Sequence, residues 1–256
     1  MNQILVTEKL YVTPELKRKK AIYKINFILS IIVIVILLSF YIHSEYAKNQ
    51  EQEISEELLS GIVENTENVE TTVNQNKDYN EVAQDDVWRV FIASTERAQQ
   101  NNDLAANQGT TKVTTAKITT NGKEYEYVGR IKIPKINVDF AILNPTDEQL
   151  VDWLKVSPCK FYGSNPNEVG NLCIAGHNYR NKKFFSKVPT LLVGDKIEIT
   201  DLSNNTLTYV IYDKYTVDPE DIRCLDQVTN GKKIITLITC TNDSKQRIIV
   251  KAKELT

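Results

Sequence analysis

The longest apolar run in the chain lies near its N-terminus. Residues 25–42 contain no charged side chain and are long enough to cross the hydrocarbon core of a bilayer as a helix. Basic residues precede this run and acidic residues follow it, which favours an N-terminus inside and the rest of the chain outside. A cleaved signal peptide is the alternative, but no small-residue cleavage pattern follows the run. We therefore expect a cytoplasmic N-terminus over residues 1–24 and an uncleaved single-pass anchor over residues 25–43.

The next segment, residues 44–123, has the composition of an extracellular stalk. It is rich in Glu, Asn, Gln and Thr and poor in aromatic residues, so much of it is expected to be extended or disordered. Residues 85–99 are an exception, because apolar side chains recur there on one face of a predicted helix: Val87, Trp88, Phe91, Ile92 and Thr95. Such a stripe is most often a packing face, and the alternative is a lid or regulatory arm over an active site.

From residue 124 to the end of the chain, short apolar or alternating runs separated by turn residues predict β-strands. The expected strands cover residues 125–133, 138–143, 172–175, 196–200, 206–217, 232–240 and 247–250. One helix is expected over residues 146–155, with Thr146 or Asp147 as its N-cap. Many short strands with few helices indicate an all-β barrel or sandwich.

Composition and charge narrow the possible functions. The chain has 256 residues and a formal net charge of -2, so nothing supports a nucleic-acid partner, which would require a basic patch. Its four cysteines lack the paired short spacings of a zinc site: Cys159, Cys173, Cys224 and Cys240. We expect Cys159 and Cys173 to be buried, reduced thiols, and one disulfide among the first three cysteines stays open as an alternative.

Cys240 ends one predicted strand, and Arg247 begins the next. The turn between them contains Asn, Asp and Ser, whose side chains hydrogen-bond their own backbone. With Asp243 and Ser244 at the centre of the turn, Cys240 faces Arg247 across the hairpin, with Cβ atoms about 5 Å apart. A thiol and a guanidinium are then expected to share one site.

His177 is the second candidate partner of this thiol. The sequence contains two histidines, and the other, His43, ends the apolar N-terminal run. A cysteine nucleophile reacts as its thiolate, which a cation stabilises, so we expect Cys240 to be the nucleophile. His177 would then perform general acid–base catalysis, and Arg247 would bind an oxyanion or the substrate backbone. Taken singly, the same three residues could be a core cysteine, a loop histidine and a solvated arginine.

Two motifs resemble the signature of a known family. Residues 236–240 (TLITC) with Arg247 after them, and residues 174–178 (IAGHN) upstream, resemble sortases, the cysteine transpeptidases of Gram-positive cell surfaces. The resemblance covers residues 127–251 and implies an eight-stranded β-barrel with few helices. It also implies the site residues, namely Cys240, His177 and Arg247 for catalysis and Thr239, Ile238 and Asn178 for substrate binding.

The resemblance further implies a substrate and a location. A membrane-anchored sortase cleaves a C-terminal sorting motif of the Leu-Pro-x-Thr-Gly type in secreted proteins. It then joins the acyl group to an amine of a peptidoglycan precursor or of a pilin, at the outer side of the cell membrane. The short segment between His177 and Cys240 argues against class B, and no Asp-Pro-aromatic lid motif of class C is seen. A class A-like or class D-like member is therefore expected.

Three questions stay open at this level. No cofactor is expected, although calcium is an alternative because some class A members bind it; its candidate ligands are Glu168, Asp218, Glu220 and Asp221. The chain could instead be a membrane-tethered β-domain that binds wall components or partner proteins without catalysis. It could also be a cysteine hydrolase that uses water as the acceptor.

Overall fold

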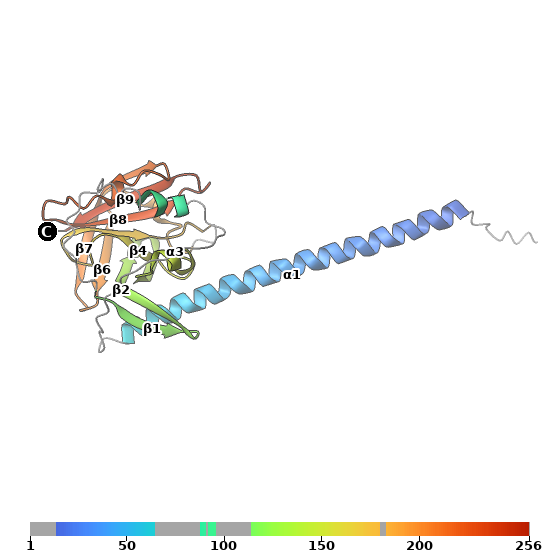
Figure 1. Ribbon diagram of the computed structural model, residues 1–256, viewed down its shortest axis with the longest axis horizontal. Helices are drawn as coiled ribbons and strands as arrows, with labels where there is room; N and C mark the ends of the chain where they lie inside the picture. The colour runs from blue at the N-terminus through green and yellow to red at the C-terminus, as the bar shows by residue number, and fades with distance from the viewer. Residues whose placement is uncertain (1–13, 65–87, 91, 96–113, 180–182, 256) are drawn as a thin grey trace, which may run out of the picture. The chain divides into compact units, whose positions relative to one another are not determined.

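The computed structural model describes residues 14–64, 88–90, 92–95, 114–179 and 183–255. The chain divides into two compact units, Met1–Gln50 and Glu51–Thr256. Helix α1 (Pro14–Glu64) continues across the boundary between them as a single helix of 51 residues (Figure 1). The predicted stalk and the predicted helix over residues 85–99 lie partly outside the described residues.

The first unit is helical wherever it is described, and it exposes its apolar side chains. Within residues 28–38, every isoleucine, leucine and valine is about half exposed. One part of α1, within Arg18–Ile62, is apolar and long enough to be a candidate membrane span, and it contains the predicted anchor. The helix then continues through residues 45–64, where a mostly extended stalk was expected, because Glu, Gln, Lys, Ala and Leu are good helix formers.

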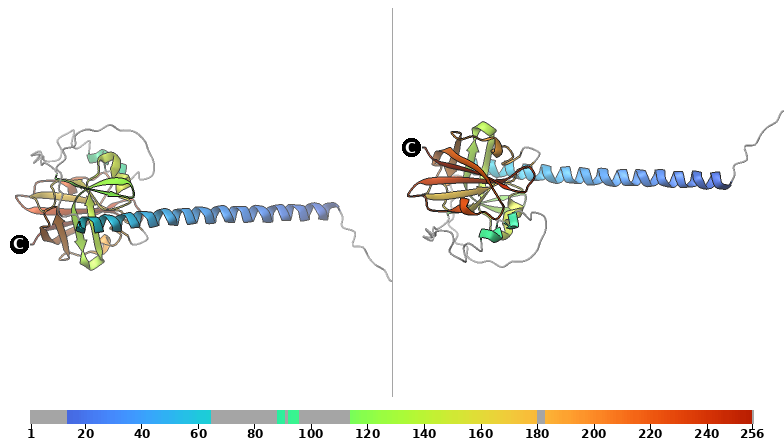
Figure 2. Two further views of the ribbon diagram at one scale, coloured as in Figure 1. Left: turned by 90° about the horizontal axis from the view of Figure 1, so that it is seen from below. Right: turned by 90° about the horizontal axis from the view of Figure 1, so that it is seen from above.

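The described part of the second unit contains nine strands. They are β1 (Ala116–Thr120), β2 (Lys123–Ile133), β3 (Val138–Leu143), β4 (Cys159–Tyr162), β5 (Gly170–Ala175), β6 (Lys196–Asp201), β7 (Thr206–Val217), β8 (Lys233–Cys240) and β9 (Arg247–Glu254). Their order is β1-β2-β3-β4-β5-β8-β9-β7-β6, and β6 also pairs with β2. This last pairing closes β2 to β9 into an eight-stranded barrel, as predicted, while β1 extends β2 as a hairpin (Figures 1 and 2).

Helices are few and short in the described part of the barrel. They are α3 (Asp147–Trp153) and three 3-10 turns, η1 (Pro134–Ile136), η2 (Val188–Thr190) and η3 (Arg223–Leu225). The side chain of Gln149 accepts a hydrogen bond from the backbone N–H of Thr146 at 3.1 Å, which satisfies one donor at the start of α3. The helix predicted over residues 146–155 is therefore confirmed, with an end at Trp153.

Side chains of the barrel strands alternate between two buried clusters. One cluster draws on seven strands and fills the barrel, with Ile131, Ile174 and Leu237 among its members. The other contains Cys240 and Ile249 and is covered by α3, by η3, by the end of α1 and by the segment at Trp88. The alternation of a β-strand therefore places Cys240 on the outside of the barrel, beneath a layer of short segments.

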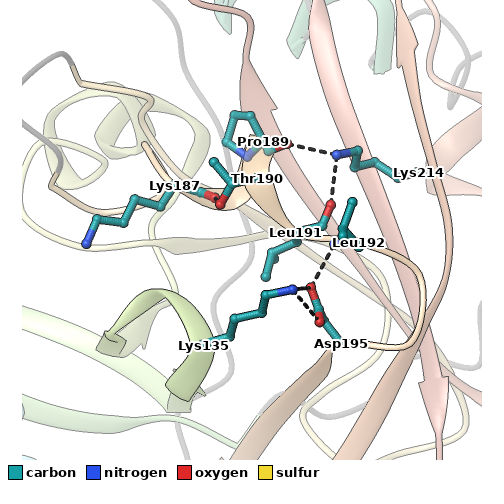
Figure 3. A network of polar contacts seen from close by, with 8 residues as sticks. All are labelled: Lys135, Lys187, Pro189, Thr190, Leu191, Leu192, Asp195 and Lys214. Atoms are coloured by element: carbon teal, nitrogen blue, oxygen red, sulfur yellow. Dashed lines mark hydrogen bonds and ion pairs between the residues drawn. The ribbon is translucent and has the colours of Figure 1, made fainter.

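The connection between β5 and β6 is held in place by two lysines from distant elements. Lys135 of η1 donates to both carboxylate oxygens of Asp195 at 2.8 Å. Lys214 of β7 donates to the carbonyl oxygens of Pro189 and Leu191, also at 2.8 Å (Figure 3). The two bonds from Lys214 satisfy backbone carbonyls at the end of η2 that would otherwise lack partners. Together with the Lys135–Asp195 pair, they fix the path of the chain between His177 and β6.

Candidate active site

Cys240 and Arg247 face each other across the β8–β9 hairpin, in the register that the sequence predicted. The Nη1 atom of Arg247 donates a hydrogen bond to the Cys240 sulfur at 3.3 Å. Arg247 is fully buried and Cys240 is 8% exposed. A buried cation that donates to a sulfur favours the thiolate over the thiol, so this pair has the chemistry of an activated nucleophile.

The turn that sets this register is built from local hydrogen bonds. The carboxylate of Asp243 accepts bonds from the hydroxyl of Thr241 and from the backbone N–H of Lys245. Ser244 takes a positive φ of 58°, which is a left-handed conformation common in tight turns. The N–H of Ser244 donates to the carbonyl of Thr241 at 2.9 Å, so the tight turn is centred on Asn242 and Asp243, one residue earlier than predicted. The register is nevertheless the predicted one, because the N–H of Thr241 donates to the carbonyl of Gln246 at 2.9 Å and closes the loop.

His177 reaches the same end of the barrel through a different pairing. Strands β5 and β8 are parallel neighbours in which Ala175 pairs with Ile238. The ladder continues with a hydrogen bond from the N–H of Gly176 to the carbonyl of Ile238 at 3.0 Å. Because His177 and Cys240 each follow this pair by two residues, they emerge side by side at the ends of adjacent strands.

The imidazole of His177 is neutral in this arrangement. Its pKa is lowered from 6.5 to about 4, chiefly by burial and further by the positive charges of Lys155 and Arg247. The His177 side chain is 6% exposed. A neutral imidazole can accept a proton from a thiol, so the resting state is ready to act as a base.

The three predicted substrate-binding residues lie next to the candidate nucleophile. Thr239 is fully buried, and its hydroxyl donates to the carbonyl of Gly176 at 2.8 Å. The amide of Asn178 donates to the carbonyl of Cys240 at 2.8 Å. Ile238 is fully buried beneath the site. Thr239 and Asn178 therefore connect the strand end that carries Cys240 to the one that carries His177, and substrate binding by this trio stays a prediction.

Trp88 belongs to the predicted apolar stripe, for which a lid over an active site was the alternative to a simple packing face. Its ring lies over the guanidinium of Arg247, with 4.6 Å between the ring centroid and the Cζ atom. It also meets the His177 ring edge-on at 6.3 Å and lies 6.4 Å from Phe161. The predicted apolar stripe was the available signal, and its packing face is the candidate active site itself.

Tyr179 was not singled out from the sequence either. Its ring stacks on His177 with centroids 4.7 Å apart and planes inclined by 22°. Phe184 follows at 5.8 Å from Tyr179, and Phe140 lies 5.3 Å from Phe184, which extends the aromatic contacts away from the imidazole. A stacked ring holds the plane of the imidazole.

The remaining cysteines are separate from this chemistry. Cys159, Cys173 and Cys224 are free and buried thiols, as expected for the first two. Burial raises the pKa of Cys159 and Cys173 well above the usual value and raises that of Cys224 to about 12. These thiols are therefore protonated at neutral pH and are poor nucleophiles.

Two of the acidic residues named as candidate calcium ligands contact other side chains, and calcium binding stays a prediction. Among the described residues, no group of three or more His, Cys, Asp or Glu side chains is arranged to hold a metal ion. Asp221 pairs with Arg223, and Asp218 accepts a hydrogen bond from Gln246 at 3.0 Å. Because calcium needs six or more oxygen ligands, this arrangement supports no step that involves the ion.

Comparisons with known proteins define the class of this site. A family model described as the sortase domain matches residues 131–255. Similar solved structures include a Clostridium perfringens sortase D5 transpeptidase, with 30% identity over 67% of this chain and 94% of that chain (TM-score 0.46). A lid mutant of sortase A from Corynebacterium diphtheriae has 25% identity over 66% of this chain and 95% of that chain (TM-score 0.47). A Clostridium perfringens sortase C with the C-terminal cell wall sorting motif has 22% identity over 68% of this chain and 92% of that chain (TM-score 0.46).

No curated protein sequence matches the chain significantly. The family-model match covers β3 to β9 and contains all three candidate catalytic residues. An eight-stranded barrel with a cysteine and an arginine across one hairpin is the architecture expected of a cysteine transpeptidase. The chain belongs to the sortase family.

Proposed function

We propose that this protein is a membrane-anchored transpeptidase that cuts a C-terminal sorting motif and transfers the acyl group to an amine. The observation that carries the proposal is the hydrogen bond from Arg247 to the Cys240 sulfur at 3.3 Å, beside a neutral His177. The sorting motif is of the Leu-Pro-x-Thr-Gly type, and the bond cut is the one between Thr and Gly. A class A-like or class D-like substrate range is the natural expectation.

The first half-reaction forms a thioester. The Cys240 thiol passes its proton to His177, and the resulting thiolate attacks the carbonyl carbon of the scissile bond. Arg247 carries a guanidinium with five N–H donors, which suits it to hold the sulfur and the developing oxyanion in turn. The protonated His177 then donates its proton to the leaving amine, and the C-terminal fragment departs.

The second half-reaction transfers the acyl group. An incoming amine attacks the thioester carbonyl, and His177, now neutral, accepts the proton that this amine loses. Collapse of the tetrahedral intermediate breaks the carbon–sulfur bond. The departing thiolate takes the proton from His177, which regenerates the Cys240 thiol and the neutral imidazole. The acceptor is an amine of a peptidoglycan precursor or of a pilin, and water in its place would give a hydrolase.

Helix α1 supports a membrane location for the proposed enzyme. Its candidate span would anchor the chain in the cell membrane, with basic residues on the inner side and the barrel outside. This topology would bring the barrel near secreted substrates and near a lipid-linked acceptor at the outer leaflet. Anchoring therefore raises the local concentration of both reactants around one active site.

The proposal is tested with the full-length chain in detergent and a peptide of the Leu-Pro-x-Thr-Gly type. We expect a thioester on Cys240 by intact mass spectrometry, and a product that shifts from acid to amide when an amine is added. Cys240→Ala should abolish both, while the matched control Cys224→Ala, which removes another buried thiol, should retain both.

Three outcomes would contradict the proposal. An active Cys240→Ala variant would exclude this nucleophile. Product that stays an acid at all amine concentrations would indicate a hydrolase. Absence of turnover, together with no labelling of Cys240 by a methanethiosulfonate reagent, would favour a binding domain without catalysis.

A further inference from the structure

A second group of reactive side chains lies outside the active site, around the connection between β4 and β5. Lys160 is the second residue of β4, and Asn165 and Glu168 lie in the loop that follows. The Lys160 amine donates to Oδ1 of Asn165 at 3.0 Å. The Asn165 amide nitrogen donates in turn to Oε2 of Glu168 at 3.1 Å. A chain of two hydrogen bonds therefore joins an amine, a carboxamide and a carboxylate, with the carboxamide between the other two groups.

The surroundings of Lys160 favour its neutral, nucleophilic form. Burial lowers the pKa of this lysine from 10.5 to about 8, and the charge of Glu168 offsets only part of that effect. At neutral pH about a tenth of such amines carry no charge, whereas an ordinary exposed lysine is almost fully protonated. Asn165 is 7% exposed, so its amide is shielded from water that would compete for the same carbon.

The loop also holds the two reacting groups in place. The side chain of Asn167 donates to the carbonyl of Asn205 at 2.7 Å and accepts a hydrogen bond from the Tyr209 hydroxyl, which ties the loop to the β6–β7 hairpin. Groups that are held within contact distance react as an intramolecular pair, which removes most of the entropic barrier. The common side reaction of asparagine, cyclisation onto the next backbone N–H, is blocked because Pro166 has none.

We propose that Lys160 and Asn165 join in an intramolecular isopeptide bond, with Glu168 as the proton carrier. The lone pair of Nζ attacks Cγ of Asn165 and forms the new carbon–nitrogen bond. Glu168 accepts a proton from Nζ and delivers it to Nδ2, the bond between Cγ and Nδ2 breaks, and ammonia leaves. Two neutral groups are converted to a secondary amide and ammonia, so the reaction needs no oxidant, metal or cofactor.

The bond would close a covalent ring across the β4–β5 connection. Strand β5 carries His177 just beyond its far end, so the ring would hold the hairpin that supports the imidazole. Cross-linked loops resist local opening, which is the step that exposes backbone to proteases. The inference is independent of the proposed transpeptidase activity.

The test is the intact mass of the full-length chain, purified in detergent. We expect a mass about 17 Da below that of the sequence, which corresponds to one ammonia lost in a covalent modification. Lys160→Arg and Asn165→Ala should each restore the full sequence mass of the variant. The matched control Lys132→Arg, at an exposed position of β2, should keep the deficit. Glu168→Gln should slow the reaction and leave a mixture of both masses.

A succinimide at Asn121-Gly122 or Asn230-Gly231 would produce the same mass loss, so the site must be located. Trypsin should fail to cut after Lys160, and the peptide that contains it should yield no fragment ions between residues 160 and 165. A full sequence mass would overturn the inference. So would a deficit that persists in Lys160→Arg.

Discussion

The indole of Trp88 covers the guanidinium of Arg247, with the Cζ atom 4.6 Å from the ring centroid. The same indole touches the edge of the His177 ring, so one side chain contacts two of the three candidate catalytic residues. Trp88 is 1% exposed in this position. A peptide that contacts Arg247 and His177 would compete with the indole for the same surface. A bound peptide is therefore expected to displace the Trp88 side chain.

Replacement of this side chain should activate the enzyme. We expect Trp88→Ala to raise kcat/KM roughly tenfold, because a desolvated cation–π contact is worth about 1–2 kcal/mol and its loss favours the open site. Trp88→Phe should have an intermediate effect. The measurement is peptide cleavage by the full-length chain, with Trp153→Phe as the control, because the Trp153 ring packs on Tyr125 at 5.1 Å. Lower activity in a folded Trp88→Ala variant would show that the indole supports catalysis instead.

The guanidinium of Arg247 should not be replaceable by an ammonium. Arg247→Lys keeps the charge but loses the forked geometry that reaches both sulfur and oxyanion. We expect kcat/KM to fall on the order of 100-fold, the usual effect of removing one oxyanion donor. Lys253→Arg, at an exposed position on the same strand, is the matched control and should behave as wild type. Equal activity of Arg247→Lys and wild type would remove Arg247 from the mechanism.

The burial of His177 should make folding stability depend on pH. The pKa of His177 is lowered to about 4 in the folded chain, against an ordinary value of 6.5, so the folded state binds fewer protons between these limits. Stability is therefore greatest above pH 6.5 and decreases as the pH falls toward 4, by about 3 kcal/mol. Urea unfolding at pH 7 and at pH 4.5 measures the effect.

His177→Gln should remove the loss of folding stability that protonation of His177 causes between pH 6.5 and pH 4. The pH dependence that comes from other groups should remain. Because the sequence contains two histidines, their proton resonances can also be assigned directly by comparison with the variant. Trp88→Ala should raise the pKa of His177 toward its ordinary value, since water then reaches the imidazole. A titration midpoint near 6.5 for His177 in the wild-type chain would contradict the buried, neutral state of its imidazole.

The hydroxyl of Thr239 should matter through the position of Cys240. Thr239→Val keeps the shape but leaves the Gly176 carbonyl without this donor, at a cost of about 1–3 kcal/mol. We expect kcat to fall roughly tenfold with little change in KM, and Thr239→Ser, which retains the donor, to restore it. A large rise in KM with normal kcat would instead indicate direct contact between Thr239 and the substrate.

Elements whose formation depends on nearby residues could be predicted from the sequence. The pairing of Cys240 with Arg247 followed from the turn chemistry of residues 241–245, because a short turn sets the register of its hairpin. Seven of the nine strands and the capped helix were predicted for the same reason, whereas β1, inside the predicted stalk, and β4 were not. The TLITC and IAGHN motifs indicated the family. The apolar run near the N-terminus was sufficient to identify a candidate membrane span.

The contacts between distant segments at the active site could not be predicted and follow from the three-dimensional fold. The parallel pairing of β5 with β8 brings His177 beside Cys240, and the docking of Trp88 on Arg247 joins segments far apart in the chain. The apolar stripe around Trp88 left a packing face and a lid over an active site both open, and nothing in the spacing of Tyr179 indicated a stacked ring. Periodicity and turn chemistry report on neighbours in sequence, whereas these contacts depend on how closed-barrel packing brings distant side chains together.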